Sequence, residues 1–78
     1  MNMNQSKIIE LHGWKNKKPI WIRTVSIFCF FRDGSFDYDI EKYNEFTKIV
    51  PIGSNPEDSE SCVCVSETPY EIMQLLKD

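Results

Sequence analysis

The sequence is poor in the residues from which catalytic and metal sites are built. Its 78 residues include a single histidine, His12, and only three cysteines. A catalytic cysteine would need His12 beside Cys29, Cys62 or Cys64, and the spacing of these residues does not favour that contact. Structural zinc sites usually combine two pairs of closely spaced ligands, whereas this chain has one Cys-x-Cys pair. We therefore expect no enzyme, no catalytic residue, no metal and no cofactor.

Glycine and long apolar runs are also scarce. The three glycines form neither a GxGxxG nor a GxxxxGK[ST] phosphate-binding pattern. No apolar stretch approaches the roughly 20 residues needed to cross a bilayer, so we expect no membrane partner. Residues 1–7 are polar and lack the apolar core of a secretory signal. Together with the odd number of cysteines, this predicts a cytoplasmic protein with reduced thiols.

The chain is short for a core that must hold a fold together unaided. Its composition, 41% apolar and 13% aromatic, is that of a globular protein. We expect a flexible tail over residues 1–6 and a single small β-rich domain over 7–78. A domain of about 60 residues buries only about 60% of its unfolded surface, and such domains often gain stability from a partner subunit. We therefore expect the protein to self-associate as a homo-oligomer.

Charge is unevenly distributed along the sequence. Residues 1–32 carry six Lys and Arg against one acid, a charge of +5, and residues 33–78 carry three Lys against eleven acids, a charge of −8. The net charge of −3 does not favour a nucleic-acid partner, because such domains are usually basic overall. Two solvated faces of unlike charge are the simplest interpretation, and they could also steer partners or subunits toward each other.

Apolar residues follow the two-residue period of strands over most of the chain. A dipeptide that suits tight hairpin turns, Asp33-Gly34, separates two of these segments. The run from Ile27 to Phe31 is apolar on both faces, as in a central strand. The acids at 33, 37, 39 and 41 lack the order of a calcium loop and indicate a solvated strand face. The predicted strands are 7–13, 20–23, 24–32, 36–41, 46–52 and 62–66.

A helix is expected at the end of the sequence. Thr68 and Glu71 form a capping box around Pro69, which suits the first helical position. The apolar stripe that follows would pack on the sheet, because so short a helix is not stable alone. The predicted fold class is α+β and mainly β, with a small antiparallel sheet of about five to six strands closed by one short C-terminal helix.

Several short segments resemble those of the small FlbD-like proteins, a family linked to flagellar motility and also present in gut bacteria and their phages. The resemblance is carried by Leu11-His12-Gly13, Lys17-Lys18-Pro19-Ile20-Trp21-Ile22, Thr47-Lys48-Ile49-Val50 and residues 63–72. In this comparison residues 34–43 look like an insertion, and the loop 53–61 stands where the family usually has a tight turn. The resemblance implies a small β-rich protein without known catalytic residues and implies no reaction.

Two functions follow as hypotheses. The first is a non-enzymatic regulatory protein that acts by protein–protein contact, in the manner of a phage-type or mobile-element inhibitor of a host factor. Its contact residues would be the basic turn, the exposed loop and the start of the helix: Lys15, Lys17, Lys18, Asn55, Glu57, Asp58 and Tyr70. The alternative is a homo-oligomer that sequesters a nucleotide-like anion between subunits, using cations and stacking rings. That site would draw on the same lysines with Arg23, Arg32, Trp14, Trp21 and Tyr38.

Overall fold

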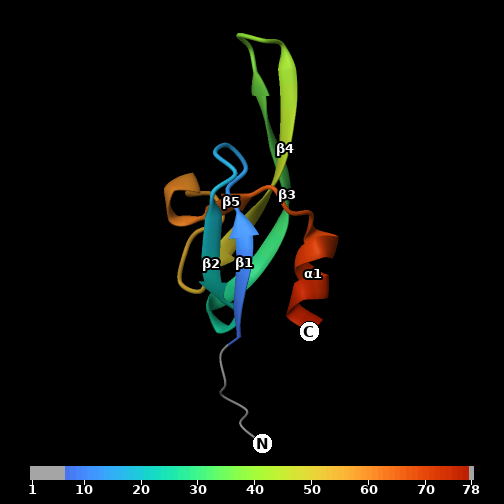
Figure 1. Ribbon diagram of the computed structural model, residues 1–78. Coiled ribbons are helices and arrows are strands. Elements are labelled where there is room, and N and C mark those ends of the chain that lie inside the picture. Colours follow the sequence, from blue (N-terminus) through green and yellow to red (C-terminus); the bar gives the residue numbers. More distant parts are fainter. Residues whose placement is uncertain (1–6, 78) are drawn as a thin grey trace, which may run out of the picture.

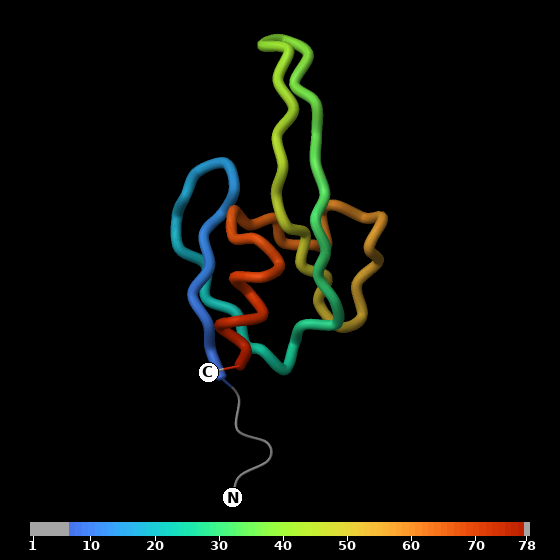
Figure 2. The backbone as a smooth tube through the Cα atoms, turned by 90° about the vertical axis from the view of Figure 1, so that its right-hand side faces the viewer, coloured from blue at the N-terminus to red at the C-terminus, as the bar shows by residue number. Residues whose placement is uncertain are grey.

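The computed structural model describes residues 7–77, which form two layers (Figures 1 and 2). The expected tail, residues 1–6, lies outside the described residues. One layer contains the antiparallel hairpin of β1 (Ile8–His12) and β2 (Pro19–Arg23), with helix α1 (Pro69–Lys77) beside β1. The other is a three-stranded antiparallel sheet of β3 (Ile27–Asp37), β4 (Lys42–Pro51) and β5 (Val63–Val65), in the order β3-β4-β5. Short 3₁₀ turns, η1 (Thr24–Ser26) and η2 (Ser59–Ser61), lie in the connections.

The protein is mainly β with one C-terminal helix, as predicted, but the strands form two sheets rather than one sheet of five to six strands. The two sheets meet at a single bridge between Gly13 and Val65. Two backbone hydrogen bonds flank it, from Ser66 N to His12 O at 2.8 Å and from Trp14 N to Cys64 O at 3.3 Å. Because β1 turns away into its own hairpin after this point, the contact does not extend into a ladder.

The core lies between the layers, where buried residues of β1, β4, β5 and α1 meet and partly buried side chains of β2 and β3 pack against them. Its buried members are Ile9, Leu11, Ile49, Val65 and Ile72. The predicted capping box starts α1 as expected: Glu71 N donates to Thr68 Oγ1 at 3.1 Å, and Thr68 N donates to Glu71 Oε1 at 2.8 Å. At the other end of the helix, Lys7 Nζ donates to the carbonyl of Leu75. The helix is therefore tied to the beginning of β1.

Three predictions about the strands were wrong. Asp33 and Gly34 lie inside β3 rather than in a turn, and the chain reverses at residues 38–41, where Glu41 has a φ of +51°. Residues 24–26 form a 3₁₀ turn. The central strand is β4, and β3 is an edge strand with Phe28 exposed. A bulge between Ile27 and Cys29 shifts the register beside Phe28.

Gly34 stays in the strand because the Tyr43 ring lies over it. A β-carbon at Gly34 would overlap this ring. The ladder therefore continues past Gly34 to the pair Asp37–Lys42, and the hairpin extends far beyond β5, which pairs only with residues 47–49 of β4. We call residues 33–46 the arm and the rest of residues 7–77 the body. Figure 1 shows the arm projecting from the body as a lone two-stranded ribbon.

We expect Gly34→Ala to destabilise the arm although alanine suits a strand better than glycine. The Tyr43 ring would have to leave its place over residue 34, and because this ring is 57% exposed, we expect a cost at the low end of the about 1–3 kcal/mol typical of overpacking. The free energy of unfolding, measured by urea denaturation, should fall for Gly34→Ala and stay near the wild-type value for Ser35→Ala, whose side chain is exposed. Equal stability of the two variants would show that the Tyr43 ring does not depend on the glycine.

Candidate functional site

The turn between β1 and β2 packs against the base of the arm. The Trp14 ring stacks on the Phe46 ring, with centroids 4.8 Å apart and planes inclined by 25°. Lys15 Nζ lies 5.4 Å from the centroid of Trp14, within the range of a cation–π contact. Lys17 adopts a positive φ of 60°, which closes the turn. We call residues 13–18 the Trp14 turn.

A cleft of about 490 Å³ separates the Trp14 turn from the arm. Trp14, Lys15 and Lys17 line one side of it. Residues of the arm, including Asp37, Lys42, Tyr43 and Glu45, line the other side together with Ser66 of the body. The cleft thus has cationic side chains on the turn and mostly acidic ones on the arm, with aromatic rings from both.

The arm exposes four large apolar side chains, one of which, Tyr43, also lines the cleft. The exposed fractions are 43% for Phe36, 83% for Tyr38, 63% for Ile40 and 57% for Tyr43. Phe36 and Tyr38 meet edge to face, with ring centroids 4.8 Å apart. Figure 2 shows that the tip of the hairpin extends beyond the turn between β1 and β2. Nearer the base, Trp14 and Lys15 of that turn line a shallow hollow together with Phe36 and Tyr38.

The predicted contact residues lie in different places. Trp14, Lys15 and Lys17 reach the cleft, and Lys18 faces a second hollow beside Cys62 and Cys64. In the loop 53–61, Asn55 Oδ1 accepts a hydrogen bond from Glu57 N at 2.9 Å, and Asp58 Oδ1 accepts one from Glu60 N at 3.1 Å. Tyr70 is exposed at the start of α1. The predicted residues thus do not form one continuous surface.

The candidates for an anion site do not converge within one chain. Trp21 is exposed on the outer side of β2 and pairs with Glu10 of β1, whose carboxylate would repel an anion. Arg23 lies at the end of the same strand. Arg32 Nη1 donates to the buried Thr47 Oγ1 at 3.1 Å, so this guanidinium supports the base of the arm. A sequestration site would need residues from several subunits, and it stays a prediction.

Lys48 is a buried cation that the sequence analysis did not single out. It is 7% exposed, and its Nζ lies 3.4 Å from Asp33 Oδ2 and 3.4 Å from the carbonyl of Pro56. It therefore ties the loop 53–61 to the sheet. Burial raises the pKa of the Cys64 thiol although the charge of Lys48, its partner across the ladder, opposes this shift. Cys64 is thus protonated at neutral pH rather than a ready nucleophile.

The single histidine joins β1 to the connection between β5 and α1. His12 Nδ1 lies 2.6 Å from Glu67 Oε2, and His12 N donates to Glu67 Oε1 at 2.9 Å; Nε2 lies 3.3 Å from Glu10 Oε2. The hydrogen bond to Glu67 raises the pKa of His12 against a smaller opposing effect of desolvation, and the negative charges of Glu67 and Glu10 add to the rise. Partial burial raises the pKa of Glu67, but the hydrogen bonds from His12 outweigh it and leave that pKa lowered.

This ion pair predicts a characteristic dependence of stability on pH. The His12 contribution is complete below its unfolded pKa of 6.5 and is lost as pH rises through the higher folded value. The Glu67 contribution is present above its unfolded pKa of 4.5 and is lost as pH falls through the lower folded value. The pair should therefore stabilise the fold most between these two values.

We expect the melting temperature of the wild type to fall from about pH 6 to about pH 9, and this fall to be smaller in His12→Gln. Thermal melts followed by circular dichroism would measure both. Glu10→Gln is the matched control, because it leaves the 2.6 Å contact between His12 and Glu67 in place. Parallel pH profiles for the wild type and His12→Gln would contradict a stabilising role of the pair.

Comparison of the chain with models of protein families, with curated proteins and with solved structures found no match. The resemblance to FlbD-like proteins therefore stays a prediction. Within residues 7–77, no helix combines the length and apolar character that crossing a bilayer requires, and no cluster of three or more His, Cys, Asp or Glu side chains is arranged to hold a metal ion. The function must be argued from the arm, the cleft and the body that supports them.

Proposed function

We propose that this protein is a non-enzymatic binding protein that acts by contact with another protein, and that the arm is its main contact element. The observation that carries the proposal is the exposure of Phe36, Tyr38, Ile40 and Tyr43 on a projecting hairpin. A lone two-stranded hairpin is marginally stable in water. Contiguous exposed apolar groups mark interaction sites, and aromatic side chains supply much of the binding energy at interfaces.

The chemistry of the arm specifies the partner surface. Asp37, Asp39 and Glu41 alternate in sequence with Tyr38 and Ile40 around the tip. Such a tip fits an apolar recess with a basic rim, where charge complementarity speeds association and rings bury against the recess. Occupying a surface in this way requires no catalytic group. This supports an inhibitor that blocks a host factor sterically, as the resemblance to proteins of phages also suggests.

The Trp14 turn would extend the contact at the base of the arm. Lys15 and Lys17 stand across the cleft from Asp37 and Glu45, so a partner that fills the cleft meets both signs of charge. We take the protein to act in the cytoplasm, and the three free cysteines are consistent with a reducing compartment. Sequestration of an anion between subunits is the competing function, and it predicts a bound small molecule rather than a protein.

The first test identifies the partner by photo-crosslinking in a lysate of the native host. A benzophenone amino acid at position 38 should give a discrete crosslinked protein, whereas the same group at position 70, also an exposed tyrosine, should not. Native mass spectrometry of the purified protein provides the second readout. A homo-oligomer that carries an extra small mass would favour sequestration over protein binding.

With the partner purified, the double variant Tyr38→Ser/Ile40→Ser should bind at least about 30-fold more weakly, the effect expected for an interface hot spot. Met73→Ser on α1 is the matched control, since Met73 is an exposed apolar residue far from the arm. Reversal of Lys15, Lys17 and Lys18 to Glu should also weaken binding, because it replaces the cations of the Trp14 turn that a partner filling the cleft would contact. An unchanged affinity of the arm variant would refute the arm as the contact element.

A further inference from the structure

Strand β2 has an outer edge with free backbone groups. Thr24 N donates to Lys7 O at 2.8 Å and Gly13 N to Lys18 O at 3.0 Å, which fixes the alternation of hydrogen-bonded pairs between β1 and β2. By this alternation Ile20 and Ile22 face β1 with their backbone groups, whereas the N–H and C=O of Trp21 point to the outer edge. Within residues 7–77 no strand pairs with that edge.

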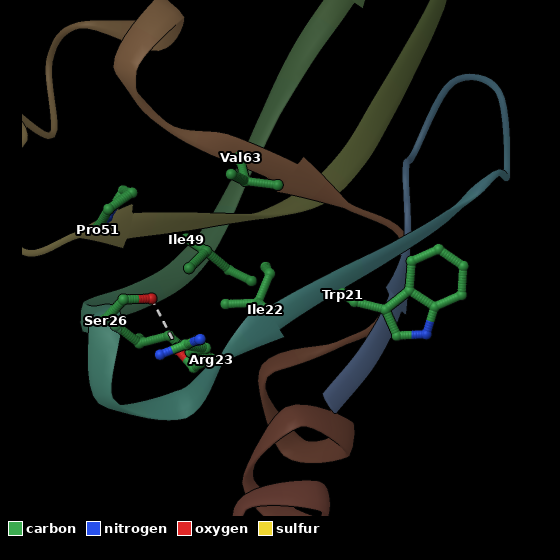
Figure 3. Close-up of a pocket in the computed structure, with 8 residues that line it drawn as sticks. Trp21, Ile22, Arg23, Ser26, Ile49, Pro51 and Val63 are labelled. Carbon is green, nitrogen blue, oxygen red and sulfur yellow. Dashed lines mark hydrogen bonds between the residues drawn. The ribbon is translucent and has the colours of Figure 1, made fainter. Parts of the chain in front are cut away.

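An apolar pocket of about 260 Å³ lies directly beside this edge, between the two layers. Figure 3 shows Ile22 of β2 and Ile49 of β4 pointing toward each other across the pocket, with Val63 of β5 nearby. The indole of Trp21 points away from the pocket in the same view, so Trp21 borders it with its backbone. The pocket is therefore open on the side where Trp21 offers a donor and an acceptor.

A cation without a partner stands at the end of the edge. Arg23 also lines the pocket, and Ser26 Oγ donates to its carbonyl at 2.7 Å, which holds the end of β2 in place. Within the described part of the chain no carboxylate lies within 4.0 Å of the Arg23 guanidinium, in contrast to Lys48 and His12, which have acidic neighbours. The site thus combines a backbone donor and acceptor, an apolar pocket and an unpaired positive charge.

Pro19 sets the length of strand that this edge accepts. Its nitrogen lies on the outer edge by the same alternation and carries no hydrogen, so it cannot donate to an added strand. Proline on an edge strand opposes the pairing of long strands and of identical edges. A second copy of β2 is therefore a poor occupant, and a segment of about three residues is a good one.

We propose that an extended segment of a partner protein adds to the outer edge of β2, antiparallel to it, with an acidic residue followed by an apolar residue. If one residue of the segment pairs with Trp21, the residue before it lies opposite Ile22 and points into the pocket. The residue before that lies opposite Arg23, where a carboxylate completes the ion pair. Backbone bonds supply affinity in such strand addition, and the pocket and the cation supply selectivity.

This inference extends the proposed function with a second contact surface on the opposite part of the molecule from the arm. It can be tested without knowledge of the partner. The probe is a fluorescein-labelled peptide, Gly-Ser-Asp-Leu-Thr-Ser-Gly, titrated with the full chain and followed by fluorescence anisotropy. We expect saturable binding with a dissociation constant below millimolar. The affinity should fall at least tenfold when the leucine is replaced by serine. N-methylation of the threonine amide, which removes the donor to Trp21 O, should weaken it similarly.

Two protein variants test the contribution of the outward backbone N–H of Trp21. Trp21→Pro removes the outward N–H and leaves the ladder to β1 intact, whereas Trp21→Val removes the same indole and keeps the N–H. The stacked Trp14 then reports folding by its fluorescence in both variants. Trp21→Pro should bind the peptide at least tenfold more weakly than Trp21→Val. Equal affinity of these two variants, or no saturable binding of the peptide up to millimolar concentration, would overturn the proposal.

Charge reversal tests the ion pair and separates this site from the arm. Arg23→Glu should weaken binding of the peptide, and a peptide with lysine in place of the aspartate should recover much of the lost affinity.

The arm variant Tyr38→Ser/Ile40→Ser should bind the peptide as the wild type does, because its changes lie outside the pocket. Loss of peptide binding in the arm variant alone would place the peptide on the arm and refute the β2 site. If the peptide still binds at β2 but the arm variant binds the partner as tightly as the wild type does, only the proposed function is refuted.

Discussion

The burial of both faces of β4 is the constraint on which the rest of the structure depends. Five consecutive residues, 46–50, are buried. On one face, Thr47 accepts a hydrogen bond from Arg32, and Ile49 packs in the core with residues of β1, β5 and α1. On the other face, Phe46 stacks on Trp14, and Lys48 holds the loop 53–61 through Pro56. A chain of this size has few residues for a core. Burying both faces of one strand increases the apolar surface that the small core removes from water.

This constraint also explains why the arm is exposed. The body covers β4 only as far as Phe46, which stacks on Trp14. The Trp14 turn is the end of the layer formed by β1, β2 and α1. Beyond that point the hairpin continues because Gly34 admits the Tyr43 ring and the ladder stays regular. Toward the tip, Phe36 and Tyr38 contact each other and remain exposed, whereas Phe46 at the base of the arm stacks on Trp14. The same boundary that completes the core creates the surface on which the proposed function depends.

Some local signals in the sequence predicted local structure correctly, whereas the turn signal Asp33-Gly34 did not, because both residues lie inside β3. The hairpin over 7–23 and the capping box of Thr68 and Glu71 depend on neighbouring residues, and both are present. The division into two sheets depends on which distant strands pair, and periodicity carries no such information. The alternation of Phe36, Tyr38 and Ile40 with acids predicted a strand over 36–41, but β3 ends at Asp37 and residues 38–41 form the turn. The pattern also does not say whether another layer exists to bury these side chains. Trp14, Lys15, Lys17 and Tyr38 were predicted as contact residues, whereas the projection of the hairpin as an arm was not predicted for this reason.

The hydrogen bond from Lys7 to the carbonyl of Leu75 has a practical consequence for how the molecule can be held. It brings the start of β1 next to the end of α1, and both lie at the end of the body away from the tip of the arm (Figures 1 and 2). A fusion made directly before Lys7 or directly after Lys77 would therefore start from the same pole. The protein can be tethered or fused at that pole while the opposite pole stays fully accessible to whatever it meets.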